Sequence, residues 1–175
     1  QAIRRASQNL PTGTILKRAD ALHPRGTSQG VEYGWQQLID IHAIAGVISN
    51  PPWGAALRQT PAELREAGYQ LAQGQFDSYD VFVEMCLRVA PRGTIFAFII
   101  PDSLFFPEHK PLRTLLLERT QLHLVARLGE GFFGDVYRGT AVVVCEKTTP
   151  RSSRSVECFR LQKQLREQVL ANKLS

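Results

Sequence analysis

Apolar residues follow two different spacings along the chain, and these spacings predict alternating strands and helices. Between Ser78 and Val89 the apolar side chains recur every three or four positions, as on one face of a helix. From Thr94 to Pro101 every residue after the threonine is apolar. Such a run is typical of a central strand in a parallel sheet and is far too short to cross a membrane. We therefore expect that strand to be covered on both faces.

The same spacings predict the remaining elements. Strands are expected at residues 14–18, 44–49, 94–101, 122–128, 140–146 and 156–161. Helices are expected at residues 2–10, 61–67, 78–89, 111–118 and 162–174. The intervening stretches 23–34, 55–76 and 129–139 are predicted loops. This alternation indicates an α/β fold with a mainly parallel sheet, and residues 122–146 are expected to form a C-terminal antiparallel hairpin.

The strand at 44–49 leads directly into Asn50-Pro51-Pro52-Trp53, where two consecutive prolines end it. Ligands of open α/β sheets bind at the carboxyl ends of the strands. An asparagine side chain and the carbonyl of the proline after it supply two acceptors that need no change of protonation state. Two such acceptors can orient a planar amine, and a nearby aromatic ring can stack on the base that carries it. An ordinary Pro-Pro turn is the alternative interpretation.

The net charge of +5 is unevenly distributed. Residues 1–146 carry equal numbers of basic and acidic side chains, whereas residues 147–175 carry seven Lys or Arg against Glu157 and Glu167. A basic segment beside a catalytic domain suits contact with a phosphate backbone, and a solvated linker helix is the alternative. The three cysteines are widely spaced, which favours reduced, buried thiols and a cytoplasmic protein.

Several segments, in order, resemble the adenine-N6 DNA methylases of restriction-modification and phage-defence systems. The Asn50-Pro51-Pro52-Trp53 segment looks like their catalytic motif, and the segments at 15–22, 77–84, 93–104, 112–117, 129–133 and 139–147 are similar to segments that accompany it. The resemblance implies a Rossmann-like methyltransferase fold. It also implies transfer of a methyl group from S-adenosyl-L-methionine to the N6 amine of adenine in DNA, with the base flipped out of the duplex.

The resemblance assigns further residues. Asp20 and Ala21 would bind the adenine of the cofactor, with Asn50, Asp77 and Tyr79 bordering its pocket. From the residues alone, Asp20 could instead be a turn residue and Asp77 a helix N-cap.

Three residues are assigned to the nucleic acid. Trp53 is expected to stack on one face of the flipped base, and Phe133 on the other, with Phe132 as the second choice. Lys147, the first cation of the basic segment, is expected to contact DNA.

One departure from the family pattern is large. A Gly-rich loop and an acid that binds the cofactor's ribose should precede Asp20 by several dozen residues, and only nineteen residues precede it. We therefore expect a partial catalytic domain over residues 1–149, without its N-terminal strands, and a basic extension or linker helix over 150–175. We further expect weak cofactor binding, inactivity of the chain alone, and a requirement for the rest of its polypeptide or a complementary subunit.

Other functions are less favoured. Release-factor glutamine methylases and some ribosomal-RNA guanine methylases resemble the same motif, usually with Tyr or Phe at the position of Trp53. A catalytically degenerate DNA-binding or scaffold subunit is also considered. The histidines are scattered without carboxylates at ligand spacing, so no metal is expected. No membrane segment is expected either, and Asp102-Ser103 is interpreted as a turn rather than a nucleophile.

Overall fold

The computed structural model describes residues 22, 24–27, 30–33, 44–133, 138–151 and 154–171. The chain divides into two units, residues 1–39 and 40–175. In the first unit, β1 (Pro24–Thr27) and β2 (Gly30–Tyr33) form an antiparallel hairpin. The sequence-based prediction of a loop over 23–34 was wrong at these residues. The helix expected at 2–10 and the strand expected at 14–18 lie outside the described residues.

The second unit contains a five-stranded sheet with the order β3-β4-β6-β5-β7. Its strands are β3 (Gly46–Ser49), β4 (Ile95–Pro101), β5 (Thr120–Gly129), β6 (Thr140–Lys147) and β7 (Glu157–Arg160). β3 is parallel to β4, β7 is parallel to β5, and β6 lies antiparallel between β4 and β5. Four of the five strands therefore run in one direction. This arrangement confirms the α/β, Rossmann-like fold and the antiparallel β5–β6 hairpin.

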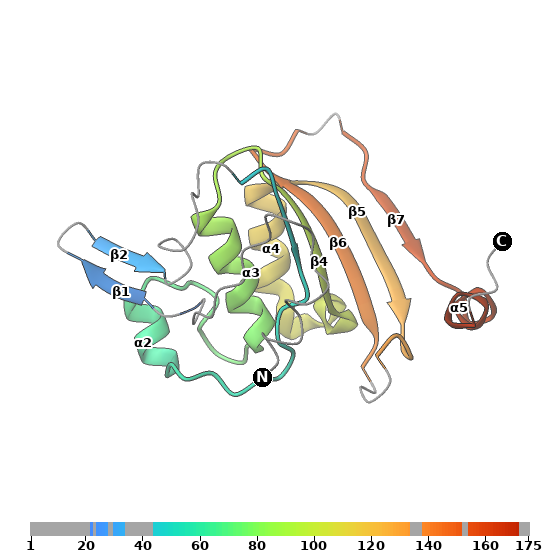
Figure 1. Cartoon of the computed structure of the whole chain (residues 1–175), viewed down its shortest axis with the longest axis horizontal. Coiled ribbons are helices and arrows are strands. Elements are labelled where there is room, and N and C mark those ends of the chain that lie inside the picture. Colours follow the sequence, from blue (N-terminus) through green and yellow to red (C-terminus); the bar gives the residue numbers. More distant parts are fainter. Residues whose placement is uncertain are drawn as a thin grey trace, which may run out of the picture. The chain divides into compact units, whose positions relative to one another are not determined.

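The helices of this unit are α2 (Pro61–Glu66), α3 (Ser78–Val89), α4 (Lys110–Arg119) and α5 (Lys163–Leu170). Two short 3₁₀ turns, η3 (Asp102–Phe105) and η4 (Pro107–His109), connect β4 to α4. Each predicted helix between residues 61 and 170 is confirmed to within a few residues. α3 and α4 lie side by side on one face of the sheet (Figure 1).

The burial of β4 follows this one-sided arrangement. Phe96, Phe98 and Ile100 are buried, whereas Ala97 and Ile99 on the other face are half-buried. The expectation that β4 would be covered on both faces was therefore only half right for the described residues. β3, which pairs with β4 on one side, leaves the side chain of Ile48 86% exposed.

Helix α3 is held in place by a buried acid in its middle. Both carboxylate oxygens of Glu84 accept backbone N–H groups, from Gln70 at 2.7 Å and Leu71 at 2.8 Å. Because Glu84 is only 2% exposed, these bonds satisfy a carboxylate that would otherwise be costly to bury. They fix the segment between α2 and α3, and with it the start of α3.

The three cysteines differ in their surroundings. Cys86 and Cys145 are buried, and burial raises their pKa values to about 12 and about 11. Cys158 on β7 is exposed, contrary to the expectation that all three would be buried. None of the helices in the described part of the chain combines the length and apolarity needed to cross a membrane.

Candidate active site

The loop that follows β3 forms the wall of a cavity at the carboxyl edge of the sheet, the edge at which β3, β4, β5 and β7 end. The cavity has a volume of about 400 Å³. It is lined by Asn50, Pro51, Pro52, Trp53, Gly54, Phe133 and Arg138. The structure thus brings the four residues of the predicted catalytic motif together with Phe133, which is eighty residues further along the chain. Phe132, the second choice, is not among the lining residues.

Two aromatic rings close one side of this cavity. The rings of Trp53 and Phe133 meet edge to face, with centroids 5.3 Å apart and planes at 85°. The indole N–H of Trp53 points toward the carbonyl of Ile99 on β4, at 3.4 Å. This contact links the loop to the centre of the sheet, and it gives the indole ring a preferred orientation.

The start of α3 anchors the same loop through three hydrogen bonds. The hydroxyl of Ser78 donates to the carbonyl of Pro52 at 2.6 Å and accepts the N–H of Ala55 at 3.1 Å. The carboxylate of Asp77 accepts the N–H of Gly54 at 2.6 Å. The carbonyl of Pro52 is therefore occupied. The side chain of Asn50, which is exposed, accepts and donates no hydrogen bond among the described residues.

Arg138 completes the anchor from the other side of the cavity. Its guanidinium donates to Asp77 at 3.2 Å and lies against the backbone of Gly54. Gly54 has a φ of 61°, and a Cβ there would stand 3.1 Å from Arg138 Nη2. The positive φ is a conformation that favours glycine, and a larger residue would also have to move the guanidinium of Arg138. Sequence reasoning missed Arg138, because nothing in a loop residue's spacing relates it to an acid sixty-one positions earlier.

The environment of Asp77 favours its charged form. Burial by itself would raise the pKa of Asp77, but hydrogen bonds from the Gly54 N–H, the Ser78 hydroxyl and the Arg138 guanidinium outweigh burial. The pKa of this carboxyl therefore lies below its ordinary value. Asp77 is accordingly engaged with the loop as an anionic anchor.

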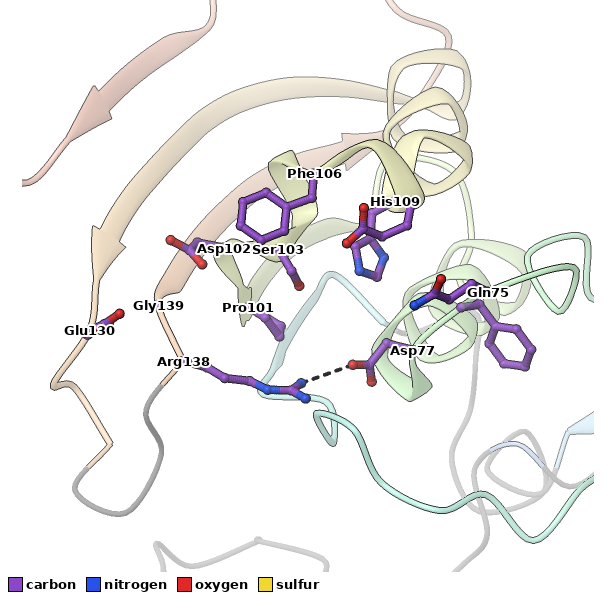
Figure 2. A pocket seen from close by; sticks show the side chains of 12 residues that line it. Gln75, Asp77, Pro101, Asp102, Ser103, Phe106, His109, Glu130, Arg138 and Gly139 are labelled. Carbon is purple, nitrogen blue, oxygen red and sulfur yellow. Dashed lines mark hydrogen bonds and ion pairs between the residues drawn. The ribbon is translucent and has the colours of Figure 1, made fainter.

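A buried polar network lies beneath a second cavity, of about 460 Å³, next to the first (Figure 2). Nδ1 of His109 is 3.0 Å from both carboxylate oxygens of Asp80. The ring of Tyr79 packs against that of His109 at 5.0 Å, and its hydroxyl is 3.2 Å from the hydroxyl of Ser103. Burial raises the pKa of Asp80, against the opposing effects of the Asp77 N–H and His109. The network fixes η3 and η4 to α3.

The predicted cofactor residues are not all placed on a cavity. Asp20 and Ala21 lie outside the described residues. Tyr79 is fully buried, and burial raises the pKa of its hydroxyl. Tyr79 therefore lies below the surface of the site rather than in its wall. Asn50 lines the first cavity and Asp77 lines the second.

Lys147 is separated from the other predicted site residues. Because β6 is antiparallel to its neighbours, it ends at the amino edge of the sheet, where β4 and β5 begin. The ammonium of Lys147 donates to the carbonyl of Ala90 at 2.5 Å and of Arg88 at 3.3 Å, and so caps the end of α3. Burial, together with the nearby charges of Arg119 and Arg92, lowers its pKa. Lys147 therefore has a structural contact at the opposite edge from Asn50.

Metal ligands are not gathered at the site. Among the described residues, no group of three or more His, Cys, Asp or Glu side chains could hold a metal ion. Ser103 contacts Tyr79 rather than His109. The arrangement at the first cavity instead offers a side-chain amide, a proline carbonyl and two aromatic rings, a combination suited to a flat amine.

Residues 42–133, more than half of the chain, match the model of the Eco57I restriction-modification methylase family. The matched segment contains the loop after β3 and ends at Phe133. No curated protein sequence matches the chain.

Solved structures share the fold at low sequence identity. A Listeria monocytogenes protein assigned as a class I S-adenosylmethionine-dependent methyltransferase is similar at a TM-score of 0.54 and 18% identity, over 74% of this chain and 41% of that one. The type IIG restriction endonuclease BpuSI is similar at 0.56 and 22%, over 78% of this chain and 18% of that one. The Type ISP restriction-modification enzyme LlaGI, solved with a DNA substrate mimic, is similar at 0.58 and 13%, over 80% and 17%. The chain spans less than half the length of each.

Proposed function

The chain belongs to the Eco57I restriction-modification methylase family, and from this premise we propose that it transfers a methyl group to the N6 amine of adenine in DNA. The observation that carries the proposal is the cavity at the carboxyl edge, where Asn50, Trp53 and Phe133 meet. A side-chain amide beside aromatic rings suits a flat nucleobase that carries an exocyclic amine. An adenine can reach such a cavity only after leaving the base stack.

Asn50 and Pro51 provide the two acceptors. The side-chain oxygen of Asn50 and the carbonyl of Pro51 would each accept one N–H of the amine, which turns the nitrogen lone pair toward the methyl donor. Pro52 is the less suitable acceptor, because its carbonyl already accepts the hydroxyl of Ser78 and is held by it. The bonds from Ser78 and Asp77 hold the loop before substrate arrives, so the acceptors need little reorganisation.

Trp53 and Phe133 would hold the base. Their rings touch each other edge to face, which leaves no room for a third ring between them. A base held between Trp53 and Phe133, stacked on both, therefore requires the two rings to separate. Because Trp53 is tied to Ile99 and Phe133 lies within the loop between β5 and β6, Phe133 is the ring expected to move.

We propose S-adenosyl-L-methionine as the methyl donor, which supplies an electrophilic methyl group when bound. The described residues fit its reactive end. Asn50 is exposed directly after β3, which is the first strand of the described sheet, and Ile48 on β3 is 86% exposed. Asp77 is committed to the loop and Tyr79 is buried, so neither offers a free polar group to the rest of the cofactor.

A methylation assay tests the proposal. Because the chain is expected to be inactive alone, it is supplemented with the rest of its polypeptide or its complementary subunit and incubated in excess with tritium-labelled S-adenosyl-L-methionine and with DNA, RNA or protein. Labelled DNA is then digested to nucleosides. Label is expected in N6-methyladenine and is expected to fall by about a hundredfold or more with the Asn50→Ala chain. Label in RNA or protein, label in N4-methylcytosine, or equal labelling by Asn50→Ala would contradict the proposal.

A further inference from the structure

Three hollows follow one another along the carboxyl edge of the sheet, and neighbouring hollows share lining residues. The cavity at Asn50 shares Arg138 with the second cavity, shown in Figure 2. The second cavity shares Asp102 and Glu130 with a third hollow of about 650 Å³, which lies between the ends of β5 and β7 and the start of α5. The surface beside the candidate base pocket therefore leads toward the C-terminal segment.

Basic side chains gather in the third hollow. Its lining includes Arg127, Arg160, Lys163 and Arg166. Arg127 is neutralised, because its Nε donates to Asp102 at 2.9 Å. Arg160, Lys163 and Arg166 form no ion pair with any described residue. Glu130, on the same wall, balances one charge at most. An excess of unpaired cations attracts an anionic ligand.

These cations lie on regular secondary structure: Arg160 is on β7, and Lys163 and Arg166 are on α5. Arg160 pairs with Arg127 in the parallel β5–β7 ladder, and the next N–H along, that of Leu161, donates to the carbonyl of Arg127 at 2.8 Å. The guanidinium of Arg166 lies directly over Gly129, where the missing side chain leaves room for it. Gly129 also has a φ of 84°, a conformation that favours glycine. Lys163 and Arg166 are three positions apart and so share a face of α5.

Three other cations in the described part of the basic segment lie at the opposite edge. Lys147 ends β6 at the amino edge, Arg151 donates its N–H to Gln121 near the start of β5, and Arg154 precedes β7. In Figure 1, β5 and β7 run away from that edge toward α5. The positive charge of residues 147–175 is thus divided between two edges, and only one part lies beside the candidate site.

We propose that Arg160, Lys163 and Arg166 bind the phosphate backbone of duplex DNA next to the flipped base. The proposal rests on the proposed function, since it takes DNA as the substrate. A duplex is favoured because the proposed reaction flips the base out of one, and its repeated phosphates can meet three cations on one wall at once. The contacts are with phosphates, so they position the DNA without reading its sequence.

Fluorescence anisotropy of a labelled duplex, measured without methyl donor across a series of salt concentrations, tests the proposal. The triple variant Arg160→Gln, Lys163→Gln, Arg166→Gln is compared with a matched control that also loses three charges, Arg92→Gln, Arg151→Gln, Arg154→Gln, at the amino edge. Each phosphate contact contributes about 0.9 to the slope of log K against log salt, so the first variant should lose about 2.7. The ratio of wild-type affinity to variant affinity should therefore fall roughly forty-fold between 50 and 200 mM salt.

The expected result is a reduced slope for the first triple variant and a wild-type slope for the control, with both variants folded by circular dichroism. Equal losses in the two variants, an unchanged slope in the first, or no binding by the wild-type chain would overturn the proposal. Tighter binding of RNA of the same length would also overturn it. Failure of the methylation assay with this binding pattern intact would instead contradict the proposed function.

Discussion

Asp77→Asn isolates the anchoring of the loop that carries Asn50. The substitution keeps the shape of the side chain but removes its charge, and it places an NH₂ group where one carboxylate oxygen stood. The bond from the Gly54 N–H, 2.6 Å long, becomes a bond to a neutral acceptor, a loss of about 1 kcal/mol. The ion pair with Arg138 disappears, and because that side chain is 50% exposed the loss is at most about 1 kcal/mol.

Together these losses predict a destabilisation of about 1–2 kcal/mol and a fall in Tm of about 2–8 °C for a chain of this length. The effect on methylation should be larger, on the order of a hundredfold, because a displaced loop misplaces both acceptors. Trp53 reports the displacement directly. In a Trp35→Phe background it is the sole tryptophan, and its emission should shift to longer wavelength as the indole becomes more exposed.

Glu63→Gln is the matched control. Glu63 also accepts a backbone N–H, from Thr60 at 2.7 Å, but it stands in the first turn of α2 and lines no wall of the candidate site. It should leave both methylation and Trp53 emission unchanged. If Asp77→Asn lowered Tm while methylation and emission stayed at wild-type values, Asp77 would be a helix cap only, and the anchoring argument would be wrong.

Three further predictions concern the same loop. Asn50→Ala should lower single-turnover methylation by about a hundredfold or more with an unchanged Tm, and near-normal turnover would refute its role as an acceptor. Trp53→Ala should weaken stacking of the flipped base by roughly 1–3 kcal/mol, whereas Trp53→Phe should be tolerated; 2-aminopurine fluorescence at the target position measures both. The lowered pKa of Asp77 means that its stabilisation is complete above the unfolded pKa of about 4 and is lost as pH falls through the lower folded value. Trp53 emission should therefore shift only in acid, and a transition near neutral pH would contradict this assignment.

Local patterns predicted most of the second unit because the spacing of apolar residues within each element was sufficient to identify it. The apolar period of α3 and the unbroken apolar run of β4 depend on no distant partner. The hairpin of β1 and β2 was missed because Pro24, Gly26 and Gly30 are residues that usually mark loops.

Only those residues of the candidate site that belong to a sequence motif could be predicted. The loop after β3 and Phe133 were assigned in advance, and the structure brings them together. Arg138 was not predicted, because its partner Asp77 is remote in sequence. Their pairing depends on the connection between β5 and β6, which carries Arg138. Lys147 was predicted to contact DNA because it lies in a basic segment. The direction of β6 was not predicted, and it places Lys147 at the amino edge of the sheet.

The insertion of β6 between β4 and β5 has a consequence for the order of folding. Its pairs with β4 join residues that are 39 to 51 positions apart, from Pro101–Thr140 to Ile95–Glu146, so they form late and slowly relative to local contacts. Phe133 and Arg138 stand on the connection that leads into β6. Of the described strands in this sheet, only β3 and β4 can pair in a nascent chain that has not yet emerged past β6, and a two-stranded ribbon is marginally stable by itself. The base pocket is therefore completed together with the pairing of β6 between β4 and β5, before β7 is added, and a ribosome-bound intermediate that lacks β6 has neither.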